Sequence, residues 1–251
     1  MSRLADKMKR AGRVEPAPIG FGAPPERRAS ATILCLLRLE KDDAKKVAQA
    51  AAAADAVIIT GAHTGKLADV LKKLGEVPAG LRLEDAKRTN VVAAREAGAD
   101  FVVLDEESAA EAVLEEKTGL VLTVDRDAGD TELRALAGLS LDALDVGPLG
   151  EPFTLRRLMG LRRVSLLAQT PLLVDVPAGI EPSRLEALRE AGVAGVVLDG
   201  RSADKLQALL GAVLSLPPRG RRREGRTEAL LPAAAAAAAA SSEEEEEPDF
   251  E

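Results

Sequence analysis

The sequence predicts one α/β domain, a (β/α)8 barrel over residues 31–217. Short apolar runs alternate eight times with helix-like stretches, which is the pattern of this barrel. The runs are almost continuously apolar, as parallel strands buried on both faces are. The last five runs end in aspartate, so polar groups gather at the carboxyl ends of the strands. In such a barrel these ends form the functional site.

The expected strands are Ala31–Leu39, Ala56–Thr60, Ala79–Leu83, Phe101–Asp105, Leu120–Asp125, Leu141–Asp145, Leu172–Asp175 and Val193–Asp199. The expected helices are Asp42–Ala54, Leu67–Leu74, Asp85–Ala97, one from about Thr131, Thr154–Ala168 and Ala203–Leu216. The phrases AREAGADFVVLD and LREAGVAGVVLD nearly repeat, and each predicts a helix that ends at a glycine before a buried strand. An open doubly wound sheet is the alternative. It normally has a glycine-rich turn after its first strand, and none follows Leu39 here.

Two flanking segments are expected outside the barrel. Residues 1–30 form an N-terminal extension, in which a helix over Arg3–Arg13 would carry Leu4, Met8 and Ala11 on one face. This helix either covers the amino-terminal mouth of the barrel or is a loose leader. Residues 218–251 combine a basic block, an alanine run and an acidic run, which predicts a disordered tail.

Composition excludes several classes of function. The net charge of −7 comes from seven acids at the C-terminus, and without them acids and bases balance at 34 each. With no Trp or Tyr, aromatic stacking on nucleic acid is not expected. The single cysteine suits a reducing compartment, and neither a signal peptide nor an apolar run of about 18 residues is present. We therefore expect a cytoplasmic protein with no membrane span and no specific nucleic-acid partner.

Residues 172–200 read LLVDVPAGIEPSRLEALREAGVAGVVLDG. This segment resembles the closing units of the phosphate-binding, aldolase-type TIM barrels. The resemblance implies that backbone N–H groups after strands seven and eight hold a phosphate, with help from a helix N-terminus. The matching positions are Ala178, Gly179, Ile180, Gly200, Arg201 and Ser202. Turns with a purely structural role are the alternative, and a flavin phosphate (FMN) in the same pocket is a lesser variant.

Aspartates at the strand ends are the main catalytic candidates. They are Asp105, Asp125, Asp145, Asp175 and Asp199, with Glu40 and Glu84 near equivalent ends. If several point inward they form an acidic ring, which could hold Mg²⁺ or supply an acid and a base. The alternative is that each caps the helix or turn that follows. We expect Asp105, Asp125 and Asp175 to carry acid–base or metal chemistry.

Four other residues could contribute. Arg38 and Arg82 lie late in apolar strands, so they either face the mouth, to pair with acids or bind a carboxylate or phosphate, or make outward loop contacts. His63, the only histidine, follows strand two and is either a general acid or base or a solvated loop residue. Cys35 lies mid-strand and is expected in the core.

These features predict an enzyme of the isomerase or lyase type, or a binder derived from one, for a small phosphorylated metabolite. No strand carries an interior lysine for Schiff-base chemistry, and one histidine with one cysteine does not suggest a zinc site. The alternative is a non-catalytic barrel that serves as a binding or scaffold protein through its charged tails.

Overall fold

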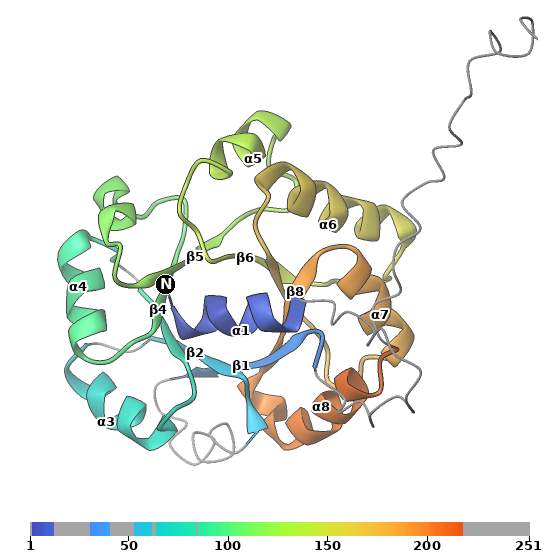
Figure 1. Cartoon of the computed structure of the whole chain (residues 1–251), viewed down its shortest axis with the longest axis horizontal. Coiled ribbons are helices and arrows are strands. Elements are labelled where there is room, and N and C mark those ends of the chain that lie inside the picture. The colour runs from blue at the N-terminus through green and yellow to red at the C-terminus, as the bar shows by residue number, and fades with distance from the viewer. Residues whose placement is uncertain (1, 13–30, 41–52, 62–63, 84, 218–251) are drawn as a thin grey trace, which may run out of the picture. The chain divides into compact units, whose positions relative to one another are not determined.

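The computed structural model describes residues 2–12, 31–40, 53–61, 64–83 and 85–217. Eight parallel strands close into a barrel in sequence order, with helices around it (Figure 1). The predicted (β/α)8 barrel is therefore confirmed, and the open-sheet alternative is wrong. The strands are β1 (Leu34–Glu40), β2 (Ala56–Thr60), β3 (Ala79–Arg82), β4 (Phe101–Leu104), β5 (Gly119–Thr123), β6 (Ala143–Pro148), β7 (Leu172–Asp175) and β8 (Val193–Asp199).

Helices follow the strands as expected, except that only a short 3₁₀ helix follows β4. They are α1 (Arg3–Gly12), α3 (Thr64–Leu74), α4 (Arg88–Glu96), α5 (Asp130–Leu136), α6 (Leu155–Ala168), α7 (Pro182–Glu190) and α8 (Leu206–Leu214), with short 3₁₀ helices η1 (Ala110–Leu114) and η2 (Gly200–Lys205). The expected final helix from Ala203 is thus divided into η2 and α8. The helix expected over 42–54 lies almost entirely outside the described residues.

Local signals in the sequence explain where several helices begin and end. The Thr154 hydroxyl accepts a hydrogen bond from the Arg157 N–H at the start of α6, and Pro182 opens α7. Gly98 and Gly192 follow α4 and α7 with φ of 103° and 102°. These are the two glycines of the repeated phrase, so the prediction that each ends a helix is confirmed.

Side chains of each strand alternate between the barrel interior and the layer beneath the helices. In β1, Leu34 and Leu36 belong to the interior cluster, whereas Cys35 and Leu37 pack toward the helices. Burial, with a contribution from the Asp55 carboxylate, raises the pKa of the Cys35 thiol to about 12. The prediction of a core cysteine is therefore confirmed.

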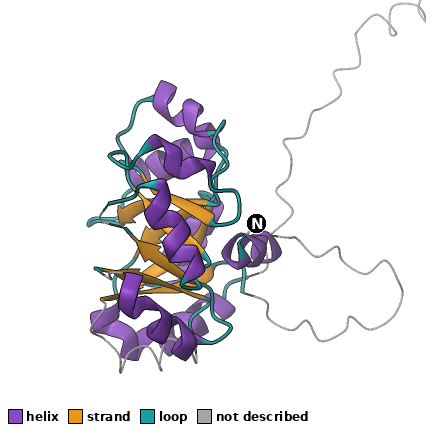
Figure 2. Ribbon diagram, turned by 90° about the vertical axis from the view of Figure 1, so that its left-hand side faces the viewer, coloured by secondary structure: helices purple, strands orange, loops and turns teal. Residues whose placement is uncertain are grey.

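Helix α1 closes the amino-terminal end of the barrel (Figures 1 and 2). Leu4 and Met8 are buried in the interior cluster, and Ala11 packs against it. The Asp100 carboxylate, just before β4, accepts hydrogen bonds from the N–H groups of Arg3 and Leu4, both at 3.0 Å. The helix therefore covers the mouth, as one of the two sequence-based alternatives expected, because the bottom interior residues would otherwise meet water.

Two further expectations concern the C-terminal tail and membrane-spanning helices. The predicted tail, 218–251, lies outside the described residues, so its disorder stays a prediction. Within the described part of the chain, no helix combines the length and apolar character that crossing a membrane requires.

Candidate functional site

An arginine and two aspartates meet inside the carboxyl-terminal mouth of the barrel. Arg38 of β1 continues the interior face of Leu34 and Leu36. Its Nη2 donates to Asp145 Oδ2 of β6 at 2.9 Å, and its Nη1 donates to Asp175 Oδ2 of β7. Of the alternatives for Arg38, pairing with acids at the mouth is therefore the one found.

The two aspartates differ in how completely they are satisfied. Asp145 is 1% exposed, and its second oxygen accepts the Gly147 N–H at 3.1 Å. Asp175 is half-buried, and its Oδ1 has no hydrogen-bond partner among the described residues. Asp145 is thus a fixed structural anion, whereas Asp175 retains an unused oxygen.

The surroundings of Asp175 raise its pKa above the ordinary value of an aspartate carboxyl. Burial raises the pKa of this carboxyl most, the Arg38 guanidinium opposes that rise, and the Asp145 carboxylate adds to it. A carboxyl with a raised pKa beside a cavity is better suited to proton transfer at physiological pH than an exposed one.

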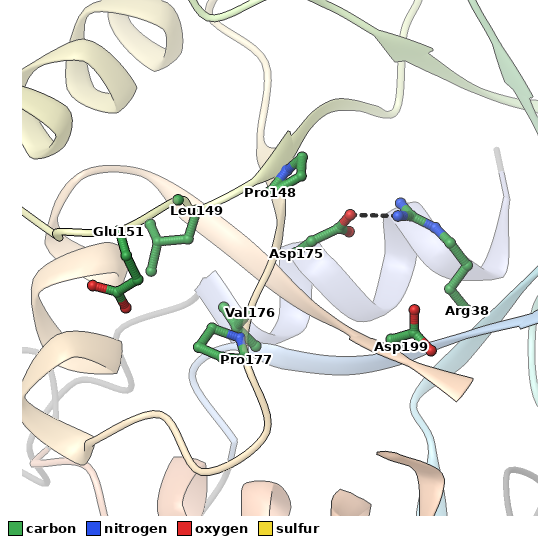
Figure 3. A pocket seen from close by; sticks show the side chains of 9 residues that line it. Arg38, Pro148, Leu149, Glu151, Asp175, Val176, Pro177 and Asp199 are labelled. Carbon is green, nitrogen blue, oxygen red and sulfur yellow. Dashed lines mark hydrogen bonds and ion pairs between the residues drawn. The ribbon is translucent and has the colours of Figure 1, made fainter. Parts of the chain in front are cut away.

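A cavity of about 350 Å³ lies against Arg38 and Asp175 (Figure 3). Its wall consists of Arg38, Pro148, Leu149, Gly150, Glu151, Asp175, Val176, Pro177 and Asp199. It therefore combines an apolar surface with a few charged groups, as small-molecule sites do.

The loop that follows β6 was missed by the sequence analysis, although it forms one wall of the cavity. The Leu149 carbonyl accepts hydrogen bonds from Arg126 Nη1 and Arg157 Nη1, both at 3.0 Å. Arg184 Nη1 pairs with Glu151 Oε1 at 2.8 Å. Two glycines and two prolines within 147–152, at the end of a barrel strand, were the signal for a shaped loop.

Two of the other strand-end acids are bonded within their own turns. The Asp105 carboxylate accepts a hydrogen bond from Ser108 Oγ at 2.8 Å, and the Asp125 carboxylate accepts one from the Asp127 N–H at 2.9 Å. Both are exposed and bonded within their own turns, which is the alternative reading of these residues. Across the described ranges, no three His, Cys, Asp or Glu side chains group so as to hold a metal ion.

The turn after β7 has the expected glycine. Gly179 has a φ of 88°, and open space surrounds the position of a Cβ there. The neighbouring Ile180 N–H donates to the Pro177 carbonyl at 3.3 Å. One donor of the predicted phosphate turn is therefore already bonded within the turn.

The turn after β8 is tightly packed. A Cβ on Gly200 would lie 2.6 Å from the Arg38 carbonyl, so only glycine fits against β1. The Asp199 carboxylate accepts the Arg201 N–H at 2.7 Å and begins η2. Arg201 is exposed and Ser202 is half-buried. Phosphate binding at Gly179, Ile180, Gly200, Arg201 and Ser202 stays a prediction, and two of the backbone donors there, the N–H groups of Ile180 and Arg201, are bonded within their turns.

Three further candidates remain. His63 and Glu84 lie outside the described residues. Arg82 ends β3, two residues after Gly80, which faces the Phe101 ring of the interior cluster. Its side chain therefore projects inward at the mouth, level with the acids rather than into an outer loop.

Comparisons with known proteins agree with this fold. The chain matches no protein-family model, and no curated protein matches it in sequence. A tryptophan synthase alpha-subunit from Pyrococcus furiosus is similar in structure, with 13% identity, a TM-score of 0.57, and coverage of 72% of this chain and 96% of that one. Thiamine phosphate pyrophosphorylase from Pyrococcus furiosus is also similar, with 18% identity, a TM-score of 0.53, and coverage of 74% and 98%. At these identities the likeness concerns the fold alone, and it agrees with the expected (β/α)8 barrel.

Proposed function

We propose that this barrel is an enzyme of the isomerase or lyase type, which moves a proton on a small metabolite bound at its carboxyl-terminal mouth. The observation that carries the proposal is the Arg38–Asp145–Asp175 group beside the cavity. Asp175 acts as the acid or base, because its pKa is raised, chiefly by burial, and one of its oxygens is unused.

Each member of the group has a separate task. Asp145, which is buried and bonded through both oxygens, fixes the Arg38 guanidinium. Arg38 in turn orients Asp175 and limits the rise in its pKa. The cavity beside them has the volume of a small metabolite, and Leu149, Val176 and Pro177 supply an apolar wall.

A phosphorylated substrate is the finer part of the proposal. The name of the similar thiamine phosphate pyrophosphorylase supports it, as does the resemblance of residues 172–200 to phosphate-binding turns. The alternative, a scaffold that acts through its tails, depends on segments outside the described residues and stays a prediction.

Exchange of carbon-bound hydrogen in D₂O tests the proposal. The protein is incubated with a panel of small aldoses, ketoses and hydroxy acids and their phosphate esters, and loss of C–H signal is followed by proton NMR. We expect wild type to exchange at least one compound and Asp175→Asn to exchange none. Asp204→Asn, which removes an exposed carboxylate from η2, should behave as wild type. Absence of exchange by wild type would contradict the proposal.

A further inference from the structure

The outermost odd-strand layer of the barrel interior is made of polar side chains. In a (β/α)8 barrel each interior layer takes one side chain from four alternate strands. Following the register around the barrel, with the shear of about eight residues that this fold has, brings four residues to one height. They form the odd-strand layer: Arg38 of β1, Arg82 of β3, Thr123 of β5 and Asp175 of β7.

This layer is incompletely bonded. Four buried side-chain atoms lack a hydrogen-bond partner among the described residues, and three of them are Arg38 Nε, Thr123 Oγ1 and Asp175 Oδ1. Arg82, which is half-buried, makes no hydrogen bond or ion pair with any described residue. Unpaired polar groups of this kind cost free energy in the folded state, so their concentration in one layer indicates a missing partner.

The charges of the layer indicate what that partner is. Both terminal nitrogens of Arg38 are paired with the Asp145 and Asp175 carboxylates, so the charge of Arg38 is already offset and only its Nε lacks a bond to a described residue. Arg82 is a cation without a counterion in the described part of the molecule, on the side of the mouth away from β6 and β7. A guanidinium offers paired N–H donors that match a carboxylate or phosphate.

Arg82 also lies within electrostatic reach of the acid–base residue. Burial raises the pKa of Asp175 most, and Arg82 is among the groups that lower it. An anion held by Arg82 would lie in the same interior layer of the mouth as Asp175.

We propose that Arg82, with the Thr123 hydroxyl as a second donor, binds the anionic oxygen group of the substrate, a carboxylate or a phosphate. This inference rests on the proposed function for the identity of the ligand as a substrate. Binding of the anion itself requires no turnover, and the site differs from the closing turns at Gly179 and Gly200.

Calorimetric thermal scans with small anions test this. The unfolding midpoint of the full chain is measured with inorganic phosphate and, separately, with malonate, at constant ionic strength. We expect at least one anion to raise the midpoint of wild type. Arg82→Gln should weaken the binding of that anion about tenfold or more, and Thr123→Val should weaken its binding less. Arg88→Gln, which removes an exposed arginine at the start of α4, is the matched control and should leave the rise intact.

A second substitution guards against a folding defect. Arg82→Lys keeps the charge but loses the paired donors, so it should retain weakened binding. Circular dichroism without anion shows whether each variant is folded. If Arg82→Gln abolishes the rise in the unfolding midpoint, the anion that causes the rise in wild type identifies the group that Arg82 binds. A rise with phosphate alone indicates a phosphate, one with malonate alone indicates a carboxylate, and a rise with both indicates that either group is accepted.

Three results would overturn the assignment. They are no rise with either anion in wild type, an unchanged rise in folded Arg82→Gln, and a rise lost only in Gly179→Asp, which would put the anion at the closing turn. Asp175→Asn separates this inference from the proposed function, because it should keep anion binding. Retained binding without hydrogen exchange in wild type would contradict the proposed chemistry alone.

Discussion

Arg38 balances two carboxylates within a few ångströms, and the stability of the mouth depends on it. Arg38→Met would leave the Asp145 carboxylate, 1% exposed, without its cation. Breaking a buried ion pair from one side is strongly destabilising, so we expect a loss of about 3 kcal/mol in the free energy of unfolding at neutral pH. Urea denaturation followed by circular dichroism measures it.

The matched control neutralises the acid as well. Arg38→Met combined with Asp145→Asn removes the uncompensated charge and should recover part of the loss. A single variant that costs less than about 1 kcal/mol, in the range of exposed pairs, would mean that Asp145 does not depend on Arg38.

Asp175 should make stability depend on pH in a defined direction. Burial raises its folded-state pKa above the ordinary value of 3.8. The folded state therefore holds this proton more tightly, so the stabilisation is complete below pH 3.8 and is lost as pH rises through the folded pKa. As pH rises from 3.8 through the folded pKa, the stability of Asp175→Asn relative to wild type should increase, and above the folded pKa this difference should stay constant. Urea denaturation over a pH series measures the difference, and a pH-independent difference would count against the shift.

At the residue scale the sequence predicted candidates better than it predicted roles. An arginine inside an apolar strand needs a partner, and that reasoning identified Arg38. Asp125 and Asp175 are equivalent in the sequence, but β5 ends at Thr123 and β7 includes Asp175. Because β5 ends two residues before Asp125, this side chain belongs to the loop after the strand and bonds the Asp127 N–H there. Thr123 is an ordinary strand residue, and only the layer geometry singles it out.

Helix α1 acts as an element of the barrel core. Leu4 is fully buried in the interior cluster, so Leu4→Ala should cost about 3 kcal/mol, from lost burial and the cavity that remains. Urea denaturation measures it. Arg10→Ala, on the exposed face of the same helix, should stay within about 0.5 kcal/mol of wild type. Equal effects of the two substitutions would contradict the packing of α1 in the mouth.

The Phe101 ring of β4 packs directly against the backbone of Gly80 in β3, and this contact can be tested. A Cβ on Gly80 would lie 2.0 Å from Phe101 Cε2, so Gly80→Ala should cost about 2 kcal/mol by overpacking. Thermal unfolding measures it, and Phe101→Leu in the same chain should relieve the clash. Gly211→Ala in α8 has open space and should instead stabilise by up to about 1 kcal/mol. A neutral Gly80→Ala would refute this packing.

Element existence was predictable from the sequence, and element ends were less so. All eight expected strands are present, and their ends differ from expectation by at most three residues. Hydrophobic runs mark strands strongly, whereas ends depend on pairing with neighbours that are distant in sequence. The 3₁₀ turn η2 replaces the start of the expected last helix because the Asp199 side chain bonds the Arg201 N–H there.

At the scale of the whole molecule, the barrel should be self-sufficient. All described residues of both buried hydrophobic clusters lie between Leu4 and Leu216. A chain ending at Pro218 should therefore unfold at the same midpoint as the full chain, by calorimetry. A lower midpoint would show that residues 219–251 stabilise the fold. An unchanged midpoint, with loss of any interaction that the full chain makes, would favour the scaffold alternative.

By itself the sequence determined the eightfold alternation, the polar carboxyl end of the barrel and the amphipathic N-terminal helix, although not that this helix closes the other end. These follow from the period and order of apolar residues, which are local properties of the chain. Only the tertiary structure decided which acids pair with Arg38 and which are bonded within their own turns, and that Arg82 lies at the mouth with no ion pair to any described residue. These relations depend on register around a closed sheet, where one residue more or less in a strand reverses the direction of a side chain.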